Sequence, residues 1–276
     1  MQKPEPIIVA ERFPALMDSL LDLLNGLSGQ EWLLPTAVSG WSVKDVVQHL
    51  LGAEVQILSG KRDRFSEPHA PLEDWDTLVA FINQRNAAWV YATRRLSPRV
   101  LCDLLRFSGD QVNAFFQSLD VYRMGGPVNW AGSGPAPVWL DIAREFTERW
   151  HHQQHIRDAV GKPGSLQPYF LNPVLAAFVY ALPQTYREVD AAEGTSITLA
   201  ITGPSGGVWS VVRETGGWQL YSGRPEHPKA EIRLREDIAW RLFTKGIRAD
   251  EARASAQLLG DQGLAERALN TISIIA

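Results

Sequence analysis

The chain has 276 residues, of which 45% are hydrophobic and 21% charged, and its net charge at pH 7 is −4. This length fits two domains of ordinary size, with enough apolar residues for a core in each. The slightly acidic balance excludes a basic surface for nucleic acid or anionic lipid, and no apolar run reaches the roughly 18 residues of a membrane span. The single cysteine, Cys102, excludes an intrachain disulfide and predicts a cytoplasmic protein.

Helical patterns dominate the first part of the chain. Apolar residues recur at steps of three and four, which is the period of an amphipathic helix. Ser42 with Asp45 is a near match to a capping box, and the helix that it starts carries His49. The last helix contains neither Gly nor Pro and is stopped by Gly161-Lys-Pro-Gly164. We expect helices over about 8–27, 42–58, 72–96, 98–119 and 138–160.

The pattern changes after Gly164. A helix is expected over about 169–189, followed by short alternating runs bounded by Gly-rich turns, which indicate an antiparallel meander. We expect strands over 196–201, 207–212, 218–221 and 230–234, and helices over 237–244, 249–259 and from 262 to the C-terminus. The sequence therefore predicts an all-α domain at 1–164 and an α+β domain at 165–276.

The most specific chemical signal is a histidine-rich stretch in the helix over 138–160. Glu148, His152 and His155 stand at i, i+4 and i+7, so they share one helix face. A carboxylate and an imidazole one turn apart are typical metal ligands, and a catalytic zinc site uses three protein ligands. His49, on another helix, is the third ligand if the two helices meet. Two histidines and one glutamate suit zinc, with nickel or iron possible by the same logic.

A second pairing on this helix has the same spacing. His151 and His155 are also one turn apart and could join His49 in place of Glu148 and His152. Residue types alone do not choose between the Glu148/His152 pairing and the His151/His155 pairing. A polar run on a helix is also typical of a solvated surface, so both pairings compete with a site that binds no metal.

Other candidates carry weaker signals. Arg85, in the helix over 72–96, could bind the carboxylate of a substrate as a catalytic residue, or could simply be solvated. Cys102 has no patterned partner and is interpreted as a small buried hydrophobe. His69 and His227 lie beside prolines and are expected to be exposed.

Two segments resemble a known family. Residues 40–50, G-W-S-V-K-D-V-V-Q-H-L, resemble a motif of the DinB-like superfamily, in particular of its mycothiol-dependent maleylpyruvate isomerase branch. Residues 148–161 are similar to that branch's E-x-x-x-H-x-x-D-hydrophobic-x-x-A-x-G motif. The resemblance implies that His49, Glu148 and His152 ligate the metal. It departs at His155, where the branch has an aspartate, and three-histidine DinB-like proteins would favour the His151/His155 pairing.

The resemblance extends to the second half of the chain. Residues 230–234, 237–246 and 259–264 resemble the sterol-carrier-like domain that follows the bundle in this branch. The implied fold is an N-terminal DinB-like four-helix bundle followed by a small antiparallel-sheet α+β domain.

The resemblance also implies a chemistry. A divalent metal, zinc before nickel, would bind a low-molecular-weight thiol such as mycothiol, whose thiolate attacks a small maleylpyruvate-like electrophile in an isomerisation or thiol transfer. A metal-dependent hydrolase and a non-catalytic protein that binds a small molecule or lipid are the alternatives. The expected partners are small molecules, and the chain could be a monomer or a homodimer.

Overall fold

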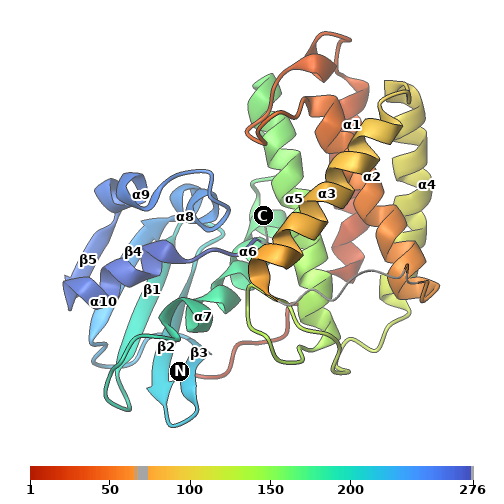
Figure 1. The fold of residues 1–276 in the computed structure, drawn as a ribbon. Coiled ribbons are helices and arrows are strands. Elements are labelled where there is room, and N and C mark those ends of the chain that lie inside the picture. The colour runs from red at the N-terminus through yellow and green to blue at the C-terminus, as the bar shows by residue number, and fades with distance from the viewer. Residues whose placement is uncertain (66, 68–73, 275–276) are drawn as a thin grey trace. The chain divides into compact units, whose positions relative to one another are not determined.

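A computed structural model describes residues 1–65, 67 and 74–274 (Figure 1). Its contacts divide the chain into two compact units. The helical unit comprises Val9–Asp120 and Glu148–Ser165, and the sheet unit comprises Met1–Ile8, Val121–Thr147 and the residues from Leu166 onward. No helix in the described part of the chain is both long enough and apolar enough to cross a lipid bilayer. The predicted domain boundary near residue 164 stays a prediction, because these units are defined by packing and each combines several chain segments.

The helical unit confirms the predicted helices (Figure 1). The first begins later than expected, because Ala10–Arg12 form a 3-10 turn and Pro14 lies in the first turn of the α-helix. The start predicted at Leu72 lies outside the described residues. A π-helical segment, Ile57–Arg62, continues the second helix. The helices are α1 (Phe13–Asn25), α2 (Val43–Gln56), α3 (Trp75–Thr93), α4 (Pro98–Gln117) and α5 (Val138–Val160), of which the helical unit contains the part from Glu148.

The start of α2 is fixed by the capping box expected from the sequence. Asp45 N–H donates to Ser42 Oγ at 3.3 Å, and Ser42 N–H donates to the Asp45 carboxylate at 3.0 Å. Further along α2, Trp89 of α3 donates its indole N–H to the Gln48 carbonyl at 2.8 Å. A Cβ at Gly52 would lie 2.7 Å from that indole ring, so only glycine lets α3 approach here. These contacts hold α2 on both sides of His49.

The core of the helical unit lies between α1, α2, α4 and α5. Val43, Val46, Val47 and Leu50 of α2 are at most 2% exposed, which buries the apolar face of this helix. His49 lies at the edge of that face and is 8% exposed. Burial of the apolar face, at roughly 1.5–3 kcal/mol for each large side chain, therefore determines the direction in which His49 points.

The sheet unit contains a five-stranded sheet and several helices (Figure 1). The expected helix over 169–189 is divided into α6 (Pro168–Phe178), a 3-10 turn and α7 (Leu182–Tyr186), and Pro183 lies in the first turn of α7. The strands are β1 (Ser196–Thr202), β2 (Gly207–Glu214), β3 (Gly217–Ser222), β4 (Ala230–Arg235) and β5 (Gln257–Gly260). The remaining helices are α8 (Glu236–Phe243), α9 (Ala249–Ser255) and α10 (Gln262–Arg267), followed by a 3-10 turn, Ala268–Asn270.

The sheet has the order β3-β2-β1-β4-β5. The meander predicted for β1, β2 and β3 is confirmed, with Leu199 opposite Trp209 and Val211 opposite Leu220. β1 is the central strand, and its residues 196–201 are buried on both faces of the sheet. On its other side β1 pairs with β4. The α+β fold class is therefore confirmed, and the core of this unit lies against the sheet.

Two details of the sheet differ from the sequence prediction. β4 does not extend the meander, because it pairs parallel with β1, with Leu199 opposite Ile232. The helix expected over 249–259 ends at Ser255, and the next residues form β5, antiparallel to β4. The four-residue strand has too few residues for its alternation to be distinguished from the end of a helix. The last helix also ends earlier than predicted, since the α-helix stops at Arg267.

Candidate metal centre

Two helices of the helical unit bring three potential metal ligands together. His49 extends from α2, and its Nε2 lies 3.2 Å from Oε1 of Glu148 on α5. His152 follows Glu148 by one turn, and its Nε2 lies 3.1 Å from the same carboxylate oxygen. One ligand atom from each residue lies within 4.8 Å of the other two. We call His49, Glu148 and His152 the ligand cluster.

The protonation states of the ligand cluster suit a cation. Burial lowers the pKa of His49 below the ordinary value of histidine, so its imidazole is neutral at pH 7 and has a free electron pair to donate. Burial opposes ionisation of Glu148, but His152 and His49 hold its pKa well below the ordinary value. The cluster thus presents a carboxylate and a neutral imidazole, the forms that bind metal ions.

The distances within the ligand cluster also fit a small divalent ion. Bonds of about 2.0–2.1 Å in a tetrahedral arrangement place neighbouring ligand atoms about 3.3 Å apart. The Glu148 oxygen is 3.2 and 3.1 Å from the two imidazole nitrogens. Three protein ligands leave one position of a tetrahedron for a substrate or water. The Glu148 side chain is 31% exposed, so that position can be reached from solvent.

The other two histidines of α5 lie beside the ligand cluster. His155 Nδ1 is 3.3 Å from Nδ1 of His152, the ring nitrogen that does not face Glu148. The ring centroids of His151 and His155 are 4.1 Å apart, and His151 is 4% exposed. Burial and the neighbouring His152 lower the pKa of His155 to about 3, and burial with His155 lowers that of His151 well below the ordinary value. His155 is thus placed to contact a ligand ring rather than Glu148.

The remaining candidates do not belong to the ligand cluster. Arg85 of α3 forms an ion pair with Glu67, with 3.0 Å between its Nη1 and the carboxylate Oε2, and the Arg85 side chain is 43% exposed. Cys102 is buried and not in a disulfide, as expected. His227 is exposed, as predicted, whereas His69 lies outside the described residues.

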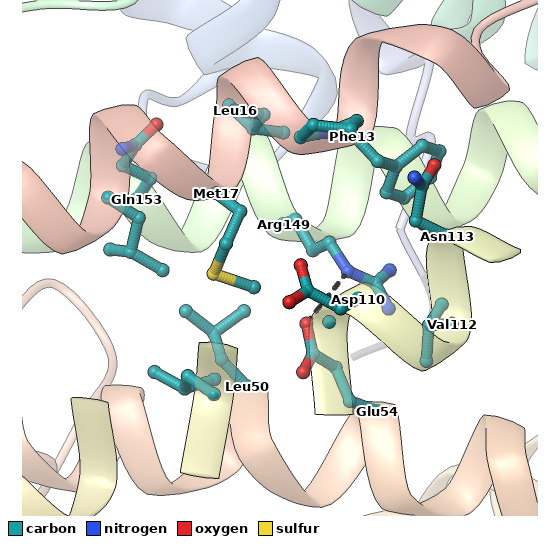
Figure 2. Close-up of a pocket in the computed structure, with 14 residues that line it drawn as sticks. Phe13, Leu16, Met17, Leu50, Glu54, Asp110, Val112, Asn113, Arg149 and Gln153 are labelled. Atoms are coloured by element: carbon teal, nitrogen blue, oxygen red, sulfur yellow. Dashed lines mark ion pairs between the residues drawn. The ribbon is translucent and has the colours of Figure 1, made fainter. Parts of the chain in front are cut away.

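One polar feature of the helical unit was not predicted. Glu54 of α2 and Arg149 of α5 form an ion pair, 3.5 Å between Oε1 and Nε, and are only 2% and 7% exposed (Figure 2). The only sequence signal for this pair was the position of Arg149, a charged residue between Glu148 and the apolar Trp150. Sequence alone pairs neither Arg149 nor Glu54 with a partner, since the two residues are far apart in the chain.

The comparisons with known proteins agree with the fold. The family model for the mycothiol maleylpyruvate isomerase N-terminal domain matches residues 13–157, which confirms the resemblance found in the sequence. The similar solved structures include the mycothiol-dependent maleylpyruvate isomerase and a histidine-to-alanine mutant of it. The identities are 12% and 10%, and each match has a TM-score of 0.51 and covers 84% of this chain and 86% of the other. No curated protein matches the chain. At such identities the structures support the fold alone.

Proposed function

We propose that this chain, which belongs to the mycothiol maleylpyruvate isomerase N-terminal domain family, is a metal-dependent enzyme that uses a low-molecular-weight thiol. The reaction is an isomerisation or thiol transfer on a small electrophilic acid of the maleylpyruvate type. The observation that carries the proposal is the ligand cluster, in which His49 from α2 meets Glu148 and His152 from α5 within hydrogen-bonding distance.

The donor set supports zinc as the ion, with nickel as the second candidate. Two imidazoles and one carboxylate with an open fourth position are the pattern of catalytic rather than structural zinc sites. A divalent ion bound there would lower the pKa of a thiol placed in the open position and so generate a thiolate at neutral pH. The family name supports mycothiol as that thiol.

The residues of the chain have defined roles in this proposal. Glu148 supplies the negative charge that offsets part of the charge of the ion, and the buried His49 stays neutral and available as a ligand. A thiolate that adds to the double bond of the substrate lets the new single bond rotate before the thiolate leaves, which exchanges the cis and trans forms. The electrophile needs its acid groups bound, for which Arg85 is the candidate.

The role proposed for Arg85 gives a separate prediction. Its ion pair with Glu67 is largely exposed, and such pairs contribute about 0–1 kcal/mol, so a substrate carboxylate can replace Glu67. Arg85→Gln should raise KM for an acidic substrate without changing the metal content. Glu67→Gln, the matched control, should leave KM unchanged or lower it. If Arg85→Gln has the KM and kcat of wild type, Arg85 does not bind the substrate.

Three finer assignments belong to the proposal. The segment 165–276 is proposed as a sterol-carrier-like domain, from the sequence resemblance and the α+β fold of the sheet unit. The cytoplasmic location follows from the single cysteine. The partners are a small-molecule thiol and a small acid, and the oligomeric state is to be measured by light scattering.

The decisive experiment is a turnover screen with the zinc-loaded and nickel-loaded protein. A panel of thiols that includes mycothiol is combined with maleylpyruvate-type electrophiles, and wild type is compared with His49→Ala and with the exposed-histidine control His227→Ala. We expect thiol-dependent turnover in wild type and in the control, and none in His49→Ala. Turnover that needs the metal and no thiol would favour a hydrolase. Failure of wild type to bind either metal would favour a non-catalytic binding protein.

A further inference from the structure

The buried ion pair of Glu54 and Arg149 lies inside the helical unit, away from water. Besides Arg149, the Glu54 carboxylate accepts a short hydrogen bond from the Ser108 hydroxyl of α4. The Arg149 guanidinium carbon lies 5.1 Å from the centroid of the Phe13 ring of α1. Side chains of four helices therefore surround the pair, and Figure 2 shows it at one side of a small cavity.

Burying these two charges is costly. Desolvation raises the pKa of Glu54, and the nearby Arg149 and the Ser108 hydrogen bond only partly oppose this. Buried ion pairs of this kind often contribute no more to stability than apolar residues of the same volume. The best-attested use of such a pair is to select one alignment of two helices over others.

The pair joins the same two helices as the ligand cluster. α2 supplies His49 and Glu54, which are five residues or about 7.5 Å apart along the helix axis. α5 supplies Glu148 and Arg149, which are adjacent and point about 100° apart. The contacts from His49 to Glu148 and from Glu54 to Arg149 thus hold different faces of α5. A sliding of α2 or a rotation of α5 would break at least one of them.

A small cavity lies beside the pair. The cavity has a volume of about 20 Å³, enough for about one water molecule, and Leu16, Met17, Leu50 and Val112 line it. Gln153 of α5 also lines the cavity and is 1% exposed, and no described residue forms a hydrogen bond with its side-chain amide. Packing at this position is therefore incomplete, and the ion pair supplies a specific polar contact between α2 and α5 beside the cavity.

We propose that Glu54 and Arg149 are positioning residues that align α2 with α5 and thereby hold His49 against Glu148 and His152. This inference rests on the proposed metal-binding function, because it concerns the geometry of the same ligand cluster. The pair maintains metal affinity, whereas apolar residues in its place can maintain the stability of the fold.

The test is a double variant, Glu54→Met with Arg149→Leu, which replaces both charges by apolar side chains. We expect its metal-free form to melt no lower than wild type, because both charges of the buried pair are removed together. Its Kd for zinc, measured by chelator competition on folded protein, should rise about 10- to 100-fold, the usual effect of losing a residue that orients ligands. The matched control is Asp18→Met with Arg106→Leu, an exposed ion pair between α1 and α4, which should leave the Kd unchanged.

Each outcome decides a separate point. Wild-type Kd in a folded double variant would overturn the positioning role and leave the proposed function intact. Absence of zinc binding by wild type itself would overturn the proposed function and the inference with it. If the double variant does not fold, Arg149→Lys decides, because it keeps the charge and loses the planar fork of arginine. Weaker zinc binding by folded Arg149→Lys supports the role, and unchanged binding overturns it.

Discussion

Zinc binding should be lost in Glu148→Gln and retained in His151→Gln. The first variant removes the carboxylate that contacts both His49 and His152, while keeping the size of the side chain. The second replaces an imidazole of the same helix that lies outside the ligand cluster, with its ring centroid 4.1 Å from that of His155. The loss of affinity in Glu148→Gln should exceed the about 10- to 100-fold known for residues that only orient ligands. Chelator competition at neutral pH measures the Kd for zinc of both variants.

The same series decides between the two pairings on α5. His155→Gln should weaken zinc binding by about 10- to 100-fold, because His155 lies 3.3 Å from the second nitrogen of the His152 ring and orients it. Thermal unfolding of each metal-free variant shows whether lost affinity reflects lost folding. Tight binding by Glu148→Gln, with lost binding by both His151→Gln and His155→Gln, would assign the site to the His151/His155 pairing instead.

The features that the sequence predicted well are local. The bounds of α5 follow from a run without Gly or Pro and a stop at Gly161, and the start of α2 follows from Ser42 and Asp45. Spacing along one helix likewise places Glu148 and His152 together. The contact of His49 with this pair was predicted only on condition that the two helices meet, because hydrophobic periodicity does not determine which helices meet, and the family resemblance favoured it.

The features that the sequence did not predict depend on long-range pairing. Glu54 and Arg149 are far apart in the chain, and each alone has the pattern of an ordinary polar residue on a helix. The parallel pairing of β4 with β1 has a similar cause, since four strands separated by turns suggest a meander until the order in the sheet is known. Local propensity carries little information on either pairing.

The metal-free protein should lose stability steeply as the pH falls from 6.5, the ordinary histidine value, towards 3. His49, His151 and His155 have lowered pKa values in the folded state. Below pH 6.5 the unfolded chain therefore binds protons that the folded chain does not bind. Each such histidine removes up to about 1.4 kcal/mol from the free energy of unfolding per pH unit, between 6.5 and its own pKa in the folded state. Below 4.5 the lowered pKa of Glu148 adds a loss in the same direction.

One buried group acts in the opposite direction. The pKa of Glu54 is raised, so its contribution to stability is complete below 4.5 and is lost as the pH rises through its folded value. Between pH 6.5 and 4.5 the three imidazoles change the free energy of unfolding more than this single carboxyl group does. Urea unfolding of chelator-treated protein across this range measures the slope, which His155→Gln should reduce and His227→Gln should not change. A profile that is flat or rises towards acid pH would contradict the buried neutral state of the three rings.

Zinc should change the dependence of the free energy of unfolding on pH, because it would bind the folded protein at the ligand cluster. A ligand that binds only the folded state adds about 2.7 kcal/mol at a free concentration of about 100 times Kd. Protons compete with the ion for the His49 imidazole, so this added stability should itself disappear as the pH falls. The gain from zinc should be absent in Glu148→Gln at every pH. Neutral imidazoles reduce the free energy of unfolding at acid pH. Binding of a cation would account for imidazoles that stay neutral in this cluster.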